Sequence, residues 1–145
     1  IIIRDEVTRN EFKAADKISG FVNPLSLVGQ KAAYDVGGKW HEEMKAYLDG
    51  NFRFLKDFLE ENLPEAVMEI PEATYLAWVD MSAYFDKEDD LPSFFAYKAG
   101  VLLEGGDALF VGNANRFIRL NLAMPRSIIQ TGLERMRDAI LAKNA

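Results

Sequence analysis

The sequence predicts an α+β fold in which a small antiparallel or mixed sheet is covered by helices. A long amphipathic stretch, about 39–63, carries an apolar stripe at helical spacing. Short segments rich in β-branched and aromatic residues follow it, and a second amphipathic stretch closes the chain. The helices before the long one do not belong to this sheet in any obvious way. We therefore expect residues 1–37 to be the end of another, larger domain, and residues 38–145 to form a small domain.

Composition limits the function further. The chain has 145 residues, of which 49% are hydrophobic and 28% charged, so it is globular and not disordered. A net charge of -6 without a basic cluster argues against nucleic acid as a partner. With no cysteine and one histidine, the sequence offers no disulfide and little material for a transition-metal site. The lack of cysteine favours the cytoplasm, and no apolar run is long enough to predict a membrane partner.

The first segment, Ile1–Ile3, has the β-branched composition of a strand. A helix is expected over about 4–18, capped either by Asp5 or one turn later by a capping box that begins at Thr8, and stopped by Gly20. Three consecutive β-branched residues are typical of a strand that is covered on both faces, and the sequence does not open on methionine. We therefore expect it to be a piece cut from a longer chain.

The second and third helices carry clear boundary signals. Asn23 is a good N-cap, Pro24 suits the first helical position, and Gly37-Gly38 ends the helix. The long helix ends before Pro64, which drives the preceding residue out of the helical region. Gly50 in its middle costs about 1 kcal/mol relative to alanine and makes a slight bend plausible. The apolar stripe of this helix comprises Trp40, Met44, Tyr47, Leu48, Phe52, Leu55, Phe58 and Leu59.

The signal then changes to strands. Segments 66–70 and 73–80 are short and rich in β-branched and aromatic residues. The acidic stretch 86–90 lacks the spacing of a calcium loop and is expected to be solvated. A short helix over 91–99 and a further strand over 101–103 follow.

The closing helix is marked by a capping box of Ser127 and Gln130. Arg126, just before it, gains nothing from the helix dipole and is expected to pair with a carboxylate or a carbonyl. The expected buried face consists of Ile128, Ile129, Leu133, Met136, Ile140 and Leu141.

Arg119 is the leading candidate for chemistry. It lies in the expected strand 117–122, where Ile118, Leu120 and Leu122 fall on one face and Arg119 falls on the other. On an open face, its guanidinium offers a rigid fork for a carboxylate or a phosphate. It can equally form a salt bridge across the sheet. The spacing alone favours neither interpretation.

Other candidates are weaker. Segment 105–107, Gly-Gly-Asp, fits no phosphate-binding motif and is read as a plain turn. His41 has no serine, cysteine or second histidine placed to act with it and is expected on the surface. The aromatic residues Trp40, Phe52 and Phe58 are more typical of a helix core than of a cofactor site. No nucleophile–base arrangement is readable.

Several segments together resemble a known family. They are EATYLAWVD (72–80), AGVLLEGG (99–106) and NRFIRLNLAMPRS (115–127), followed by the closing helix. They resemble the C-terminal portion of a fold-type I PLP-dependent enzyme, in the cystathionine β-lyase-like C–S lyase branch of the class I/II aminotransferases. Upstream, NPLSLVGQKAAYDVGGKWHEEMKAYLDGN (23–51) resembles the segment that leads into the interdomain helix of that branch. The likeness covers essentially all of the chain, in the same order.

The resemblance implies a PLP-dependent parent enzyme, a homodimer that acts on amino acids by C–S lysis or transamination. Residues 38–145 would be its small domain, and residues 1–37 the end of its large PLP-binding domain. Arg119 matches the family arginine that binds the substrate α-carboxylate. Asn23 and Pro24 match a loop that approaches the cofactor site of the neighbouring subunit. The strand that holds Thr74 and Tyr75 matches one near the cleft, and these two residues receive no role.

The same resemblance implies that this chain holds no catalytic residue. The family's Schiff-base lysine lies in a Ser-Lys-x-Phe-Asn motif, and no lysine of this sequence follows a serine. We therefore expect the chain alone to be inactive and to bind no PLP. The sequence departs from the family at Gly105-Gly106, where a proline-glycine pair is usual, and at Met124, where cysteine is frequent. The alternative function is a free-standing, non-catalytic module that binds small molecules or partner proteins.

Overall fold

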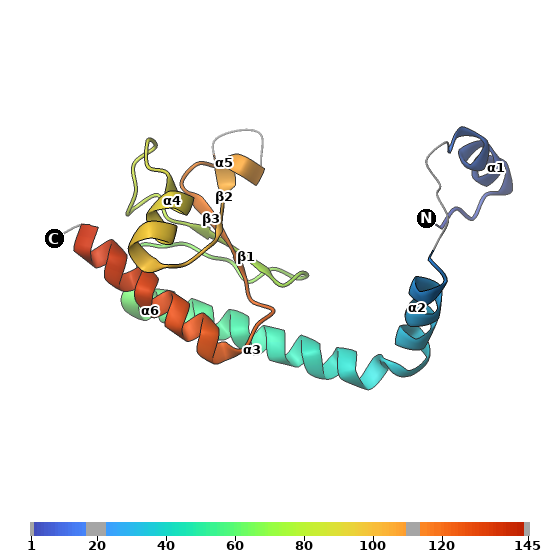
Figure 1. Ribbon diagram of the computed structural model, residues 1–145, viewed down its shortest axis with the longest axis horizontal. Coiled ribbons are helices and arrows are strands. Elements are labelled where there is room, and N and C mark those ends of the chain that lie inside the picture. Colours follow the sequence, from blue (N-terminus) through green and yellow to red (C-terminus); the bar gives the residue numbers. More distant parts are fainter. Residues whose placement is uncertain (1, 17–22, 110–113, 144–145) are drawn as a thin grey trace. The chain divides into compact units, whose positions relative to one another are not determined.

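A computed structural model describes residues 2–16, 23–109 and 114–143 of the chain (Figure 1). The chain divides into two compact units, residues 1–41 and 42–145. Each unit is described by itself below.

The first unit begins with α1 (Glu6–Ala15). The side chain of Asp5 accepts a hydrogen bond from the Thr8 N–H at 2.8 Å, so the helix has the earlier of the two expected caps, and the capping box at Thr8 is wrong. The expected stop at Gly20 lies outside the described residues. Ile2 and Ile3 form no strand, and Ile2 is 95% exposed. The prediction of a strand here is wrong for these two residues, since a strand needs a neighbour and no described segment pairs with them; Ile1 is outside the described part.

The second helix of this unit, α2 (Pro24–Val36), has the boundaries that its sequence predicts. The Asn23 side chain accepts from the Leu25 N–H at 2.9 Å, and Gly37 is the C-cap. None of its residues is buried, and Leu25 and Val36 are 79% and 81% exposed. The apolar face that the sequence predicts is therefore present on α2 but uncovered.

The second unit contains a three-stranded sheet in the order β1-β3-β2. Both pairings are antiparallel, which confirms the predicted α+β class with a small antiparallel sheet. The strands are β1 (Leu76–Asp80), β2 (Glu104–Gly105) and β3 (Phe117–Asn121). Segment 86–90 joins neither a helix nor a strand, as expected. The central position of β3 places Arg119 in the middle of the sheet, between both neighbours.

Two predicted strands are wrong. In segment 66–70 only Val67 forms a bridge, and its partner Asp80 is the last residue of β1. Segment 101–103 is not a strand, and Leu102 is 90% exposed. The pairing with β3 begins directly after this segment, at Glu104, which the register joins to Arg119.

From α3 onward, the described residues form five helical segments. Residues 91–99 are helical as predicted, but the second half is a π-helix that ends at Gly100, whose φ of 64° suits glycine. The segments are α3 (Gly38–Asn62), α4 (Leu91–Phe94), η1 (Phe95–Ala99), α5 (Gly106–Leu109) and α6 (Arg126–Lys143) with α3 beginning in the first unit.

Helix α6 begins at Arg126, two residues earlier than the predicted N-cap at Ser127 implies. The Pro125 carbonyl accepts hydrogen bonds from the N–H groups of Ile128 and Ile129, at 2.9 and 3.2 Å. The predicted capping box is wrong, because the Gln130 side chain instead donates to Glu134 at 2.9 Å. Ile128 and Leu141 are 56% and 54% exposed, so the buried face of α6 is narrower than predicted.

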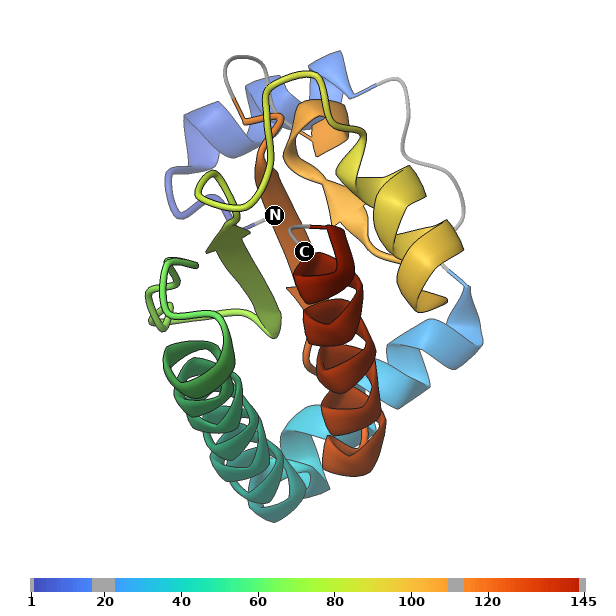
Figure 2. The same cartoon turned by 90° about the vertical axis from the view of Figure 1, so that its left-hand side faces the viewer.

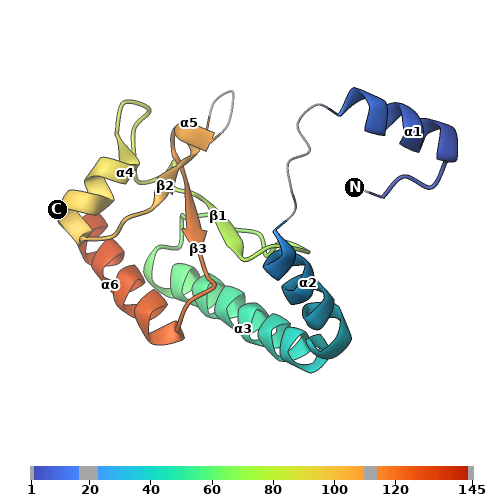
Figure 3. The same ribbon diagram turned by 45° about the vertical axis from the view of Figure 1, so that its right-hand side comes forward.

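The core of the second unit lies between the sheet and the two long helices. In Figure 1 and Figure 3, α3 and α6 both run along the same side of the sheet. Strand alternation directs Val79 and Ile118 to this side, where both are almost fully buried. From the helices, the buried residues are Phe52, Leu55 and Leu59 of α3 and Ile129, Leu133, Met136 and Ile140 of α6. Trp40 and Tyr47, predicted as members of the α3 stripe, are exposed.

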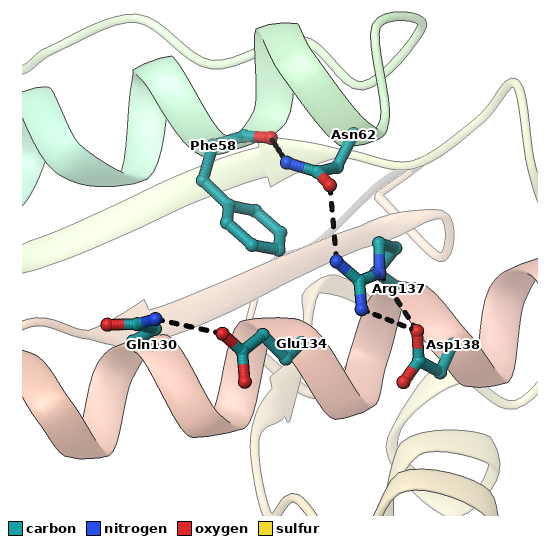
Figure 4. A network of polar contacts seen from close by, with 6 residues as sticks. All are labelled: Phe58, Asn62, Gln130, Glu134, Arg137 and Asp138. Carbon is teal, nitrogen blue, oxygen red and sulfur yellow. Dashed lines mark hydrogen bonds and ion pairs between the residues drawn. The ribbon is translucent and has the colours of Figure 1, made fainter.

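Polar contacts join the C-terminal part of α3 to α6, and Figure 2 shows the two helices running next to each other. Arg137 of α6 donates to the side-chain oxygen of Asn62 at 3.3 Å, and the Asn62 amide donates to the Phe58 carbonyl at 3.0 Å (Figure 4). Asp138 holds the same guanidinium at 2.8 Å. These contacts satisfy a carbonyl in the last turn of α3.

A second set of contacts joins the middle of α3 to the turn between β3 and α6. Asn51 is fully buried, and its amide nitrogen donates to the carbonyls of Leu122 and Met124 at 2.9 and 3.2 Å. Its oxygen accepts from the Nε of Arg126 at 3.1 Å, so Arg126 finds the carbonyl partner that the sequence predicts. We call Asn51 with these three partners the Asn51 clamp.

Gly50 makes room for this clamp. A Cβ added at Gly50 would lie 2.6 Å from Nη2 of Arg126, closer than real contacts allow. The guanidinium also lies over the rings of Tyr47 and Phe54, 5.7 and 5.9 Å from their centroids. Glycine in the middle of α3 therefore has a packing reason.

This packing gives a prediction for Gly50→Ala. In an Arg126→Ala background, the new methyl group meets no other atom within 4 Å, and the helix propensity of alanine should stabilise the unit by about 1 kcal/mol. In the wild-type background the displaced guanidinium should offset most of that gain. Urea unfolding of the four proteins in a double-mutant cycle measures the difference. Equal effects in both backgrounds would contradict the packing role.

A second prediction concerns Asp90, the N-cap of α4. Hydrogen bonds from the Ser93 hydroxyl and from the Ser93 N–H, at 2.6 and 3.2 Å, lower the Asp90 pKa below its ordinary value of 3.8. A lowered carboxyl pKa stabilises the fold above the ordinary value, and this stabilisation is lost as the pH falls through the lowered pKa. The free energy of unfolding of Asp90→Asn should therefore depend less on pH between about 5 and 2 than that of the wild type. Ser93→Ala should show part of the same change.

Candidate functional site

The candidate site is built on the open face of β3. The register places Trp78 of β1 and Glu104 of β2 on either side of Arg119, and cross-strand partners share a face. On the opposite face, Ile118 and Leu122 are each 1% exposed. The predicted alternation of this strand is therefore confirmed, and it directs the guanidinium away from the core.

Arg119 has a carboxylate partner. Its Nε donates to Oε2 of Glu104 at 2.7 Å, and its Nη2 contacts the same oxygen. The two side chains are 28% and 54% exposed, so this ion pair adds at most about 1 kcal/mol of stability. The salt bridge that the sequence analysis left open as an alternative is thus present.

Two stacked aromatic rings lie on the same face. The centroids of Trp78 and Phe117 are 5.3 Å apart, with 14° between the ring planes.

Gly106 packs closely against Ala114 and Trp78. A Cβ at this position would lie 2.1 Å from the Ala114 carbonyl oxygen and 2.9 Å from the Trp78 ring. Segment 105–107 is therefore a tightly packed junction between β2 and α5, where the sequence analysis expected a plain turn.

A cavity of about 390 Å³ opens beside Arg119. One wall of the cavity is formed by the segment 100–103, which precedes β2, and by the end of β3. The other wall is the first half of α6. Its polar lining comes from Arg119, Asn121, Thr131 and Arg135. Its apolar lining consists of Val101, Leu102, Leu103, Leu120, Leu122, Met124, Ile128, Ile129, Leu133 and Met136, with Gly100 and Gly132 completing it.

This lining defines what the cavity can bind. Two guanidinium groups, Arg119 and Arg135, stand at an otherwise mainly apolar surface. Within the described part of the chain, the side chain of Arg135 forms neither a hydrogen bond nor an ion pair. An apolar molecule that carries a carboxylate suits such a surface, since a guanidinium holds a carboxylate through two parallel hydrogen bonds.

Of the remaining residues that the sequence analysis singled out, Met124 lines this cavity, whereas Asn23, His41, Thr74 and Tyr75 do not. Asn23, in the first unit, is exposed, and its side-chain oxygen is occupied as the N-cap of α2. His41 is exposed, as predicted. Thr74 precedes β1 with a φ of 78°, so the predicted strand does not reach it, and Tyr75 contributes its carbonyl to a hydrogen bond with the Leu122 N–H.

The described residues contain no group of histidine, aspartate and glutamate side chains that could hold a metal ion. Among the same residues, no helix combines the length and the apolar character needed to cross a membrane.

Sequence reasoning missed Glu104 as the partner of Arg119. It placed the neighbouring strand at 101–103, where the apolar residues are, although the strand that pairs starts at Glu104. It also missed Asn51 as a buried polar residue. The signal that could have found it is an asparagine next to a glycine within the apolar half of α3.

Comparison with curated proteins finds relatives along almost the whole chain. Cystathionine β-lyase PatB of Bacillus subtilis is 34% identical over 142 residues, which is 97% of this chain and 36% of that protein. Protein MalY of Escherichia coli is 30% identical over 97% of this chain and 37% of its own length. The chain thus spans little more than a third of the curated relatives it matches. No family model matches the chain.

Solved structures agree. A PLP-bound C–S lyase of Staphylococcus hominis has a TM-score of 0.87 and 43% identity, covering 97% of this chain and 37% of that one. Cystalysin of Treponema denticola, which contains pyridoxal 5′-phosphate, has a TM-score of 0.83 and 34% identity, covering 97% of this chain and 36% of that one. Both likenesses extend over 97% of this chain and are not confined to its sheet.

Proposed function

Because the chain is homologous to the C-terminal part of the PLP-dependent cystathionine β-lyase-like C–S lyases, we propose that it is the substrate-carboxylate-binding part of such an enzyme. The proposed substrates are amino acids, and the proposed reaction of the complete enzyme is C–S lysis at the β-carbon. Transamination by the same kind of enzyme is the second candidate reaction.

The observation that carries this proposal is the place of Arg119. It stands on the open face of the central strand, borders the cavity and keeps its guanidinium partly exposed. In this proposal the guanidinium binds the α-carboxylate and so fixes the orientation of the amino acid. The stacked rings of Trp78 and Phe117 form an apolar wall on the same face. The chain's own residues thereby bind and orient the substrate.

The cavity in this chain does not fit the cofactor itself. PLP enzymes of this family hold the cofactor as a Schiff base with a lysine, and among the described residues no lysine lines the cavity. We therefore assign to it only the carboxylate. In the complete enzyme, bound PLP would act as the electron sink. The Schiff-base lysine would come from outside this chain, and we propose that the chain alone is inactive.

Further parts of the proposal follow from the same family. Residues 1–37 would be the end of the large PLP-binding domain and residues 38–145 the small domain. The complete enzyme would be a cytoplasmic homodimer, in which Asn23 lies towards the cofactor site of the neighbouring subunit. The exposed apolar side chains of α2 support a covering partner for that helix.

We predict that Arg119→Lys in the complete enzyme raises the KM for amino acids by about 10- to 100-fold, because an ammonium cannot form the two parallel hydrogen bonds of the guanidinium. The absorbance of protein-bound PLP should not change. Steady-state kinetics together with an absorbance scan measures both quantities.

The matched control is Arg53→Lys. Arg53 pairs with Asp49 on the exposed side of α3 and should leave the kinetics unchanged. Unaltered kinetics in Arg119→Lys would show that another residue binds the carboxylate. A protein that carries this sequence in its natural context and shows no bound PLP would favour the alternative, a non-catalytic binding module.

A further inference from the structure

The guanidinium of Arg119 offers two edges to a carboxylate, and Glu104 already takes one of them. The contacts with Oε2 of Glu104 use Nε and Nη2, which together form the side-on edge. The end-on edge, Nη1 with Nη2, makes no other contact in the part of the chain that the structure describes. A ligand carboxylate must therefore displace Glu104 or bind next to its negative charge.

We propose that Glu104 is a built-in competitor, a carboxylate of the chain itself that competes with ligand carboxylates for Arg119 and so weakens the binding of all of them by a common factor. This inference rests on the proposed function, in which Arg119 binds the substrate carboxylate. It goes further by assigning a role to a residue that neither the family likeness nor the sequence pattern assigns.

The register of the sheet fixes the distance between the competing carboxylate and Arg119. Glu104 and Arg119 are direct cross-strand partners, so the carboxylate is held beside the guanidinium at a high effective concentration. At the same time the Glu104 side chain is 54% exposed and belongs to a strand of two residues. It can leave Arg119 without disturbing the core, and water can solvate it after it leaves.

This arrangement sets a common threshold of affinity for carboxylates. Every carboxylate pays the same cost to reach Arg119, whatever the rest of the molecule is. Only ligands that gain further free energy elsewhere overcome that cost, and the cavity beside Arg119 offers mainly apolar surface for this purpose. The site therefore favours carboxylates with an apolar body over small carboxylates such as acetate.

The test uses Glu104→Gln in the 145-residue chain. Glutamine keeps the length of the side chain and an oxygen that can accept from Nε, but it removes the charge. We expect the dissociation constants of 4-methylpentanoate and of acetate to fall together, by about two- to fivefold, the range that corresponds to an exposed ion pair. The shift of the Arg119 Nε–H resonance in a nitrogen-15 NMR titration measures them.

Two further variants keep the outcomes distinct. Asp49→Asn removes the same charge from an ion pair on α3 and should leave both constants unchanged. Arg119→Gln should abolish binding, which is followed in this variant by the resonances of the cavity residues. If Arg119→Gln abolishes binding while Glu104→Gln and Glu104→Ala leave it unchanged or weaker, the competition is refuted and the proposed function stands. If Arg119→Gln binds as the wild type does, the carboxylate role of Arg119 fails, and the competition fails with it.

Discussion

The buried amide of Asn51 is the contact on which the arrangement of the second unit depends. It joins the middle of α3 to the two carbonyls that follow β3, at 2.9 and 3.2 Å, and both Asn51 and Leu122 are buried there. A buried carbonyl without a donor costs about 1 to 3 kcal/mol, so loss of the contact with the Leu122 carbonyl would make this turn unfavourable. The amide thus sets where the central strand ends and where α6 begins.

The same turn brings a cation to the N-terminus of α6, where the helix dipole opposes it. Arg126 is stabilised there by the oxygen of Asn51 and by the rings of Tyr47 and Phe54. Gly50 provides the space for the guanidinium. Helix α3 therefore holds the strand, the turn and the helix in one arrangement, and the cavity lies between the parts so arranged.

Arg119 shows that a structural and a functional interpretation of one arginine need not exclude each other. Its ion pair with Glu104 is a contact across the sheet, as a purely structural arginine would make. The same pair leaves the end-on edge of the guanidinium next to a cavity with an apolar lining. In our proposal, this salt bridge weakens the binding of every carboxylate at the site, so that a ligand also needs apolar contacts in the cavity.

The sequence by itself determined the features that depend on near neighbours. The helices α2 and α3, the caps at Asn23 and Gly37 and the two faces of β3 follow from hydrogen bonds and periodicities within a few residues, which the sequence shows directly. The family likeness led to the proposal that Arg119 binds a carboxylate, which periodicity could not distinguish from a salt bridge.

Only the tertiary structure decided the partners. Strand β2 lies at Glu104 and not at the more apolar residues before it, because pairing depends on the register with β3 and not on local composition. The predicted capping box at Ser127 does not form, because the carbonyl of Pro125 accepts the first hydrogen bonds of α6. Ile2 and Ile3 form no strand, because no described segment pairs with them. Asn51 is buried because its three partners lie more than 70 positions away, from 71 to 75 along the chain. Contacts over such distances are set by the packing of the whole unit, and no local pattern records them.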